Sequence, residues 1–129
     1  MTKARKVNSI YISYARRDAS KVDFILKNLV ARGYIKEGDR ILKEDLLPQK
    51  HRSLREGVKR TIQLASKVVV LWDAASASSQ WVNYEIGIAD ALEKPIIAVV
   101  QKKSGIALPL NLRHVQVVSL IDDDSLTEK

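Results

Sequence analysis

Val68-Val69-Val70-Leu71-Trp72 is the stretch that decides the fold of this 129-residue chain. All five residues are apolar, with no alternation between apolar and polar positions. A strand that faces water on one side alternates, whereas a parallel strand covered by helices on both faces is apolar throughout. Ile96-Ile97-Ala98-Val99-Val100 repeats the pattern. The two runs therefore predict the centre of a parallel sheet with helices on both faces.

Three further strands are expected outside these runs, at residues 9–13, 40–43 and 115–120. The strand at 40–43 is short and flanked by charge, and the one at 115–120 is partly alternating, as is typical of sheet edges. Weak second and fifth strands beside strong third and fourth strands match the order 2-1-3-4-5. We therefore predict an α/β, flavodoxin-like three-layer sandwich with a five-stranded parallel sheet and helices on both faces. Residues 1–129 form one domain, with a core from about residue 8 to 120.

Helices are expected between the strands, where apolar residues recur at helical spacing. The first helix has the apolar stripe Val22, Ile25, Leu26 and Leu29. Asp18 is expected to cap this helix, and Gly33 lies where its C-cap should be. A capping box at residues 53–56 predicts the start of the second helix, and Ser79 is the expected N-cap of the third. The small, polar residues 74–79 are expected to form a loop.

Composition limits the class of protein. The chain is long enough to bury a core without a metal or disulfides, and it has no cysteine, which excludes disulfide and thiolate chemistry. Its net charge of +7 favours an anionic partner such as a nucleotide. Nucleic acid is disfavoured, because no aromatic residues interleave the basic positions Arg52, Arg55 and Lys59. No signal-peptide core or membrane-spanning stretch is seen, so we expect a soluble, cytoplasmic domain with no membrane partner.

One carboxylate interrupts an apolar helix face. The face is formed by Trp81, Ile88, Ala89 and Leu92. Glu85 falls on the same stripe, where it must be paired or line a cavity, because desolvating an unpaired charge is costly. In the predicted strand order, the ligand crevice opens at the carboxyl ends of the first and third strands. These ends are residues 13–16 and 73–81, so Glu85 is predicted to lie on the helix that leaves the crevice wall.

Common nucleotide and metal motifs are missing from the sequence. It contains no G-x-G-x-x-G, no G-x-x-x-x-G-K-[ST] and no histidine or carboxylate cluster with metal spacing, so no metal site is expected. A phosphorelay receiver shares the predicted topology, and Asp73 would supply its aspartate after the third strand. A receiver also needs an acidic pair after the first strand, where Ser13-Tyr14-Ala15-Arg16 offers none. The receiver is therefore the weaker alternative.

Three segments resemble the signature regions of Toll/interleukin receptor (TIR) domains, closest to the bacterial type. They are Ile10-Tyr11-Ile12-Ser13-Tyr14-Ala15-Arg16-Arg17-Asp18, the loop Asp45-Leu46-Leu47-Pro48, and Ser79-x-Trp81-x-x-x-Glu85. They occur in the family's order and spacing, and the resemblance extends from about residue 8 to 120. The sequence departs from the family where Gln49 replaces the usual glycine after Pro48, and where little chain remains for a C-terminal helix. We therefore expect a domain excised from a longer protein, with a fused or separate sensor module.

The resemblance implies one of two activities. Many bacterial and plant TIR domains are NAD glycohydrolases whose catalytic glutamate lies in the W-x-x-x-E pattern, and others are non-catalytic adaptors that signal by assembling. The presence of Glu85 favours the enzyme, active when clustered in antiviral defence signalling. NAD+ would then be its substrate, no cofactor is implied, and the products would be nicotinamide and linear or cyclic ADP-ribose.

The resemblance also implies the residues that surround Glu85. The predicted substrate-binding residues are Ser13, Tyr14, Arg16, Asp45, Ser79 and Trp81, and the predicted self-association interface contains Leu47, Pro48 and Lys50. Arg16 suits the pyrophosphate as a bidentate donor. Ser79 either contributes a hydroxyl group or caps its helix, and Trp81 packs in the core beside the pocket. The alternatives for Glu85 are an ion pair, with Arg16 as the candidate partner, or a solvated position on the flank of the helix.

Overall fold

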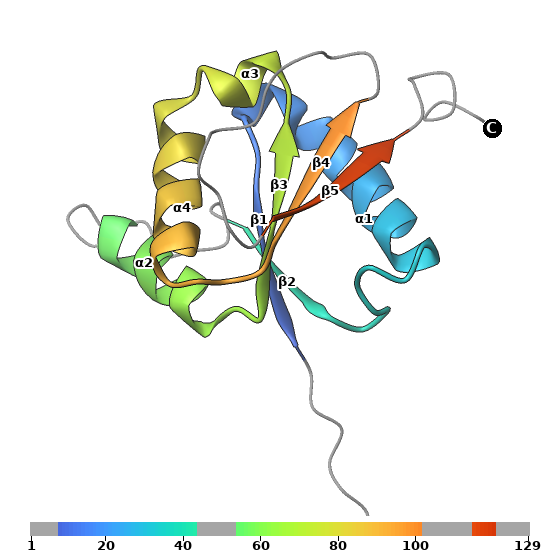
Figure 1. Ribbon diagram of the computed structural model, residues 1–129, viewed down its shortest axis with the longest axis horizontal. Coiled ribbons are helices and arrows are strands. Elements are labelled where there is room, and N and C mark those ends of the chain that lie inside the picture. Colours follow the sequence, from blue (N-terminus) through green and yellow to red (C-terminus); the bar gives the residue numbers. More distant parts are fainter. Residues whose placement is uncertain (1–7, 44–53, 102–114, 121–129) are drawn as a thin grey trace, which may run out of the picture.

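A sheet of five parallel strands in the order β2-β1-β3-β4-β5 forms the middle layer of the computed structural model (Figure 1). The structure describes residues 8–43, 54–101 and 115–120. Helix α1 covers one face of the sheet, and α2 and α4 cover the other. The predicted flavodoxin-like, three-layer arrangement is confirmed.

Each expected strand lies within one residue of its predicted bounds. The strands are β1 (Ser9–Ser13), β2 (Arg40–Leu42), β3 (Lys67–Trp72), β4 (Ile96–Gln101) and β5 (Val115–Leu120). The helices are the 3-10 helix η1 (Arg16–Lys21), α1 (Val22–Ala31), α2 (Leu54–Leu64), α3 (Ala74–Ala77) and α4 (Gln80–Ala91). Within the described ranges, no helix is long and apolar enough to cross a membrane.

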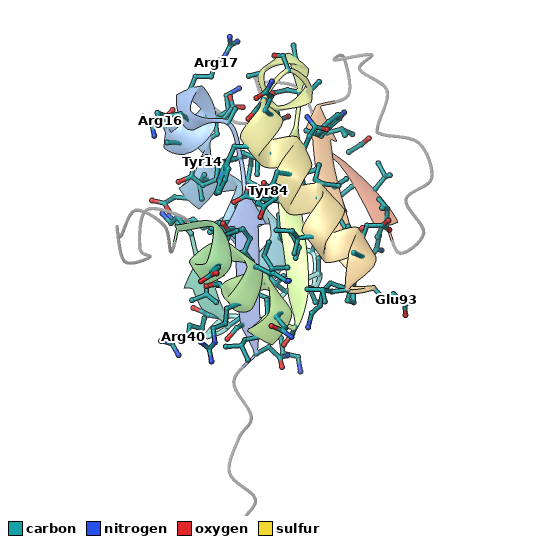
Figure 2. All side chains as sticks on the ribbon, turned by 90° about the vertical axis from the view of Figure 1, so that its left-hand side faces the viewer. Tyr14, Arg16, Arg17, Arg40, Tyr84 and Glu93 are labelled. Carbon is teal, nitrogen blue, oxygen red and sulfur yellow. The ribbon has the colours of Figure 1, made fainter. Side chains whose placement is uncertain are left out.

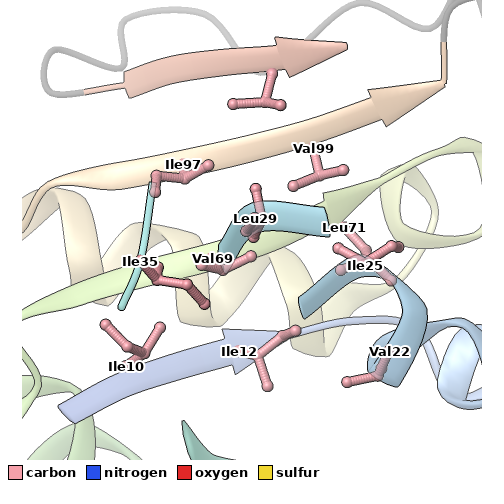
Figure 3. Packing of buried hydrophobic residues seen from close by; sticks show 11 residues of the cluster. Ile10, Ile12, Val22, Ile25, Leu29, Ile35, Val69, Leu71, Ile97 and Val99 are labelled. Atoms are coloured by element: carbon pink, nitrogen blue, oxygen red, sulfur yellow. The ribbon is translucent and has the colours of Figure 1, made fainter. Parts of the chain in front are cut away.

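The core consists of two apolar layers, one on each face of the sheet. The layer beneath α1 includes Ile10, Ile12, Val22, Ile25, Leu29, Val69, Leu71 and Val99 (Figure 3). The layer beneath α2 and α4 includes Tyr11, Val58, Ile62, Val68, Val70, Trp72, Val82 and Ile86. Successive side chains of β1 and β3 thus alternate between two buried layers, which is why residues 10–12 and 68–72 are aliphatic or aromatic without alternation.

The connection from β1 to α1 differs from the sequence-based expectation. Asp18 does not cap α1: it lies buried inside η1, whose N-cap is Ala15, and α1 begins only at Val22. Exposed N-cap aspartates accept hydrogen bonds from the first turn of a helix. Here the Asp18 side chain is buried and hydrogen-bonds to Asp73 across the sheet edge, so a tertiary partner has replaced the local one.

The segment after β3 is also more ordered than predicted. Residues 74–77 form the short helix α3 rather than a loop. The Asp73 carboxylate accepts a hydrogen bond from the Ser76 backbone N–H at 3.0 Å, and Ser76 Oγ accepts one from the Asp73 N–H at 2.7 Å. This reciprocal capping box satisfies two free backbone donors and ends β3 sharply. The capping box predicted for α2 at residues 53–56 begins outside the described residues.

Helix α1 ends as predicted, at a glycine. Gly33 has a φ of +84°, its N–H donates to the Val30 carbonyl at 3.0 Å, and the Tyr34 N–H donates to the Leu29 carbonyl at 2.9 Å. These two bonds form a Schellman motif, which requires a left-handed residue just beyond the helix. Glycine adopts this conformation without the steric cost that a Cβ imposes.

Gly33 and Gly87, both exposed to solvent, make a matched test of this ending. A Cβ at either position would meet nothing within 4 Å, so only backbone conformation differs between them. We expect Gly33→Ala to lower the free energy of unfolding by about 1 kcal/mol, because alanine is strained at positive φ. Gly87→Ala, inside α4, should raise it by about 1 kcal/mol. Urea unfolding of both variants checks the opposite signs, and equal effects would contradict this account of the α1 ending.

Candidate active site

Buried polar side chains gather at one edge of the sheet. Within the described residues, the buried polar or charged side chains are Ser13, Asp18, Ser76 and Glu85. Ser13 ends β1, and the other three lie on η1, α3 and α4, which follow the carboxyl ends of β1 and β3. Burying polar groups costs free energy unless they are bonded. Their concentration at the strand-order switch point marks this edge as the candidate site.

Glu85 is the charged residue at the centre of this edge. It lies on the second turn of α4 and is only 1% exposed. The Tyr11 hydroxyl donates a hydrogen bond to its Oε2 at 2.5 Å, and Ser13 Oγ donates to its Oε1 at 2.5 Å. Both donors come from the same face of β1, two residues apart. Each carboxylate oxygen of Glu85 therefore has a hydroxyl partner from the central strand.

Helix α4 is held so that Glu85 faces β1. Ser79 Oγ accepts a hydrogen bond from the Val82 N–H at 3.1 Å, so the predicted N-cap is confirmed. Val82, Ile86 and Ala89 are buried in the layer that also contains Tyr11. The same apolar face that anchors the helix therefore carries the carboxylate into the layer, and Ser79 fixes where the helix begins.

Trp81 stands one turn before Glu85 and is half-buried. It packs against the core beneath α2 and α4, as predicted, and its ring lies 5.2 Å from the Tyr84 ring, centroid to centroid, at 30°. The indole Nε1 is buried and has no hydrogen-bond partner in the part of the chain that the structure describes. An indole N–H usually finds a partner when buried, so this unsatisfied donor is a cost that the helix carries beside Glu85.

The remaining predicted site residues take different places. Tyr14 is half-buried and packs against the layer beneath α1, whereas Arg16 is exposed at the start of η1. Figure 2 shows the Arg16 and Arg17 side chains extending outward from η1, with Tyr14 and Tyr84 closer to the body of the domain. The predicted substrate residue Asp45 and the predicted interface residues Leu47, Pro48 and Lys50 lie outside the described residues.

Two aspartates pair at the same edge. Asp18 and Asp73 share a side-chain hydrogen bond, and Asp18 Oδ1 lies 3.5 Å from Lys21 Nζ. Burial, with the Asp73 hydrogen bond and negative charge, raises the pKa of Asp18 to about 6. The bond from Asp18 and the Ser76 cap lower the pKa of Asp73, despite the opposing effect of its burial. Asp18 Oδ2 accepts no hydrogen bond from any described donor, and a proton on the Asp18 carboxyl group would make it the donor to Asp73.

Other parts of the described structure offer less chemistry. No group of three His, Cys, Asp or Glu side chains in the described ranges could hold a metal ion. A hollow of about 350 Å³ lies at the opposite end of the sheet, between α1 and the segment leading into β2. Aliphatic side chains such as Leu26, Val30 and Ile41 line much of it. The polar cluster around Glu85 is therefore the stronger candidate for a reaction site.

A family comparison identifies this arrangement. The model of the TIR domain family matches residues 10–129. The chain belongs to the TIR domain family. No curated protein matches the sequence significantly. The W-x-x-x-E glutamate that suggested the family is thus the buried carboxylate at the centre of the site.

Solved structures share the fold of this TIR domain at low sequence identity. The TIR domain of the Toll-related receptor TRR-2 from Hydra magnipapillata is 17% identical, with a TM-score of 0.62, over 85% of this chain and 82% of that one. The TIR domains of the activated Roq1 resistosome are 18% identical, with a TM-score of 0.56, over 74% of this chain and 58% of that one. The CMP N-glycosidase BcmB from Clostridium botulinum is 14% identical, with a TM-score of 0.57, over 87% and 88%.

Sequence reasoning missed two residues of the site in this TIR domain. The predicted strand and the first TIR-like segment both contain Tyr11 without assigning it a role, although a hydroxyl-bearing ring in a fully buried strand signals a buried partner. Asp18 was interpreted as a local helix cap, and no local signal indicates its pairing with Asp73. Both contacts join segments far apart in the chain, so periodicity alone does not reveal them.

The raised pKa of Asp18 has a consequence for stability. The folded state binds the Asp18 proton more tightly than the unfolded chain does. Protonation of Asp18 therefore adds to the free energy of unfolding at low pH, and this stabilisation is lost as pH rises through about 6. Asn at this position donates a hydrogen bond to Asp73 at every pH. We therefore expect Asp18→Asn to be more stable than the wild type at pH 7.5, by roughly 2 kcal/mol, with a smaller advantage at pH 5.

Urea unfolding at the two pH values measures this difference. Asp23→Asn, at an exposed position on the first turn of α1, is the matched control. The control should change stability by the same amount at both pH values. An advantage of Asp18→Asn that does not grow between pH 5 and pH 7.5 would show that the aspartate pair does not share a proton.

Proposed function

We propose that this TIR domain cleaves NAD+ at the bond between nicotinamide and ribose, with Glu85 as the catalytic carboxylate. The observation that carries the proposal is the burial of Glu85 with a hydroxyl donor on each oxygen. A carboxylate held in a desolvated layer acts on developing positive charge far more strongly than one in water. Evolution of such a costly arrangement is expected at a reaction site rather than in a structural core.

The chemistry suits a single carboxylate. Breaking the C1′–N bond sends the bonding electron pair to nicotinamide, which leaves as a neutral molecule, and the ribose passes through an oxocarbenium-like state. Because nicotinamide is already a cationic leaving group, no general acid is required. Glu85 would stabilise the positive charge at C1′ and orient the ribose hydroxyls. Attack by water at C1′, with loss of one proton to the solvent, then gives linear ADP-ribose, and attack by a nitrogen of the substrate's own adenine gives a cyclic isomer.

Neighbouring residues are assigned supporting roles in this proposal. Arg16, exposed on η1, binds the pyrophosphate. Trp81 walls the pocket with its ring, and Ser13, Tyr14, Asp45 and Ser79 complete the predicted set. The name of BcmB states that it is an N-glycosidase for CMP, and the nicotinamide–ribose bond is likewise N-glycosidic. The same fold is therefore compatible with this reaction class.

Activity is proposed to depend on clustering of several domains. The neighbouring Roq1 TIR domains come from an activated resistosome, which is an assembly. Leu47, Pro48 and Lys50 are the proposed contact residues, and antiviral defence signalling is the proposed setting. A fused or separate sensor module would bring the domains together. The alternative function is a non-catalytic adaptor that signals through TIR–TIR contacts alone.

Replacement of Glu85 separates the two functions. We expect clustered wild-type protein to release nicotinamide from NAD+, and Glu85→Gln to lower the rate by about 100-fold or more, because it removes the charge that stabilises the transition state. Glu93→Gln, at an exposed position just beyond α4, is the matched control and should retain activity. Nicotinamide is followed by chromatography, with and without forced clustering. If clustered wild type releases no more nicotinamide than Glu85→Gln, the enzymatic function is wrong and the adaptor remains.

The proposed interface is tested by reversing one charge. Lys50→Glu should weaken self-association, because it replaces an attractive charge in the proposed contact with a repulsive one. Lys59→Glu, at an exposed position on α2, is the matched control and should leave association unchanged. Light scattering over a concentration series measures the apparent mass. Identical curves for wild type and Lys50→Glu would exclude this loop as the interface.

A further inference from the structure

A phenol lies buried in the middle of the central strand. Tyr11 is 0% exposed and belongs to the apolar layer beneath α2 and α4. Its backbone pairs with Leu42 of β2 and Val68 of β3, so the strand fixes its position on both sides. Its hydroxyl donates to Glu85 Oε2, a residue 74 positions later in the chain. The ring fills core space, and the hydroxyl group reaches the carboxylate.

Packing alone does not account for the hydroxyl group. A phenylalanine at position 11 would fill nearly the same volume without bringing a polar atom into an apolar layer. A buried hydroxyl without a partner costs free energy, whereas a hydrogen bond to a charged acceptor is among the stronger ones. The bond to Glu85 therefore explains why this position carries tyrosine.

The two donors of Glu85 occupy different depths. Tyr11 lies in the middle of β1, and Ser13 lies at its carboxyl end, nearer the edge where the crevice is predicted. The carboxylate spans the distance between them, with Oε2 toward the core and Oε1 toward the edge. Two bonds to two oxygens leave the carboxylate group one orientation relative to the strand. A side chain with several rotatable bonds is thereby fixed at its reactive end.

We infer that Tyr11 is a positioning residue for Glu85, holding Oε2 from inside the core while the carboxylate faces the substrate at the strand end. This inference rests on the proposed function, in which Glu85 acts on the ribose. Tyr11 itself lies beneath the carboxylate and touches no substrate. Its effect belongs to the chemical step, because it orients the group that stabilises the transition state and leaves the binding surface intact.

Tyr11→Phe removes the hydroxyl group and keeps the ring. We expect kcat for nicotinamide release by the clustered domain to fall about 10- to 100-fold, the range for one hydrogen bond to a charged group, while KM stays within about threefold. Tyr34→Phe makes the same chemical change at a half-buried tyrosine that packs beneath α1. This matched control should leave both constants unchanged. A rise in KM with unchanged kcat would overturn the inference. A kcat equal to that of Tyr34→Phe would also overturn it.

A spectroscopic measurement tests the contact independently of turnover. In protein labelled with 13C at the glutamate carboxyl groups, the Glu85 resonance is the one absent from Glu85→Gln. We expect this resonance to shift in Tyr11→Phe and in Ser13→Ala and to stay in place in Tyr34→Phe. If the wild type releases no nicotinamide, the proposed function fails, and the resonance decides the positioning role alone: a shift supports it and an unmoved resonance overturns it.

Folding of the variant is checked by its melting curve. If Tyr11→Phe does not fold, the wild-type proton spectrum takes its place. A tyrosine hydroxyl proton bonded to a buried carboxylate exchanges slowly and gives a resolved downfield signal. Loss of that signal in Glu85→Gln supports the inference, and its absence from the wild-type spectrum overturns it.

Discussion

The hydrogen bonds between β1 and the Glu85 carboxylate are the constraint on which the rest of the structure depends. A charged group that is 1% exposed between a sheet and a helix is tolerable only when both of its oxygens are bonded, and the two donors must come from a rigid element. Tyr11 and Ser13 meet this requirement because alternate residues of a strand share one face. The position of α4 over β1 is therefore fixed by polar contacts as well as by apolar packing.

The strand order makes these contacts geometrically feasible. In the order β2-β1-β3-β4-β5, β1 lies beside β3 although η1, α1, β2 and α2 separate them in the chain. The segments that leave β1 and β3 at their carboxyl ends therefore meet at one edge. Asp18 on η1 and Asp73 after β3 pair there, as Ser13 and Glu85 do. The topology thus brings together residues whose separation in sequence is large and whose chemistry is complementary.

The sequence predicted the fold more completely than the site, for a physical reason. Continuous apolar strands and helical apolar stripes are local patterns, and the burial of both sheet faces follows directly from them. Glu85 was also predictable, because a carboxylate on an apolar stripe violates such a pattern. Tyr11 violates none, since tyrosine is common in strands, and only its partner distinguishes it. The two aspartates differ from their local patterns. Asp18 is suited to a helix cap but pairs with Asp73, and Asp73, expected only to end a strand, also caps α3.

The structural features that cost stability are not spread evenly over the molecule. In the described residues, the features that cost stability gather at the carboxyl ends of β1 and β3. They include the buried carboxylate Glu85, the raised pKa of Asp18 and the unpartnered indole N–H of Trp81. A structural core has no reason to concentrate such costs, because apolar side chains of similar volume would stabilise it more. A reaction site does, since groups that are desolvated and held in advance need little reorganisation when charge develops on a substrate. Concentrated costs of this kind are therefore typical of a reaction site, and the apolar layers beneath α1, α2 and α4 compensate for them.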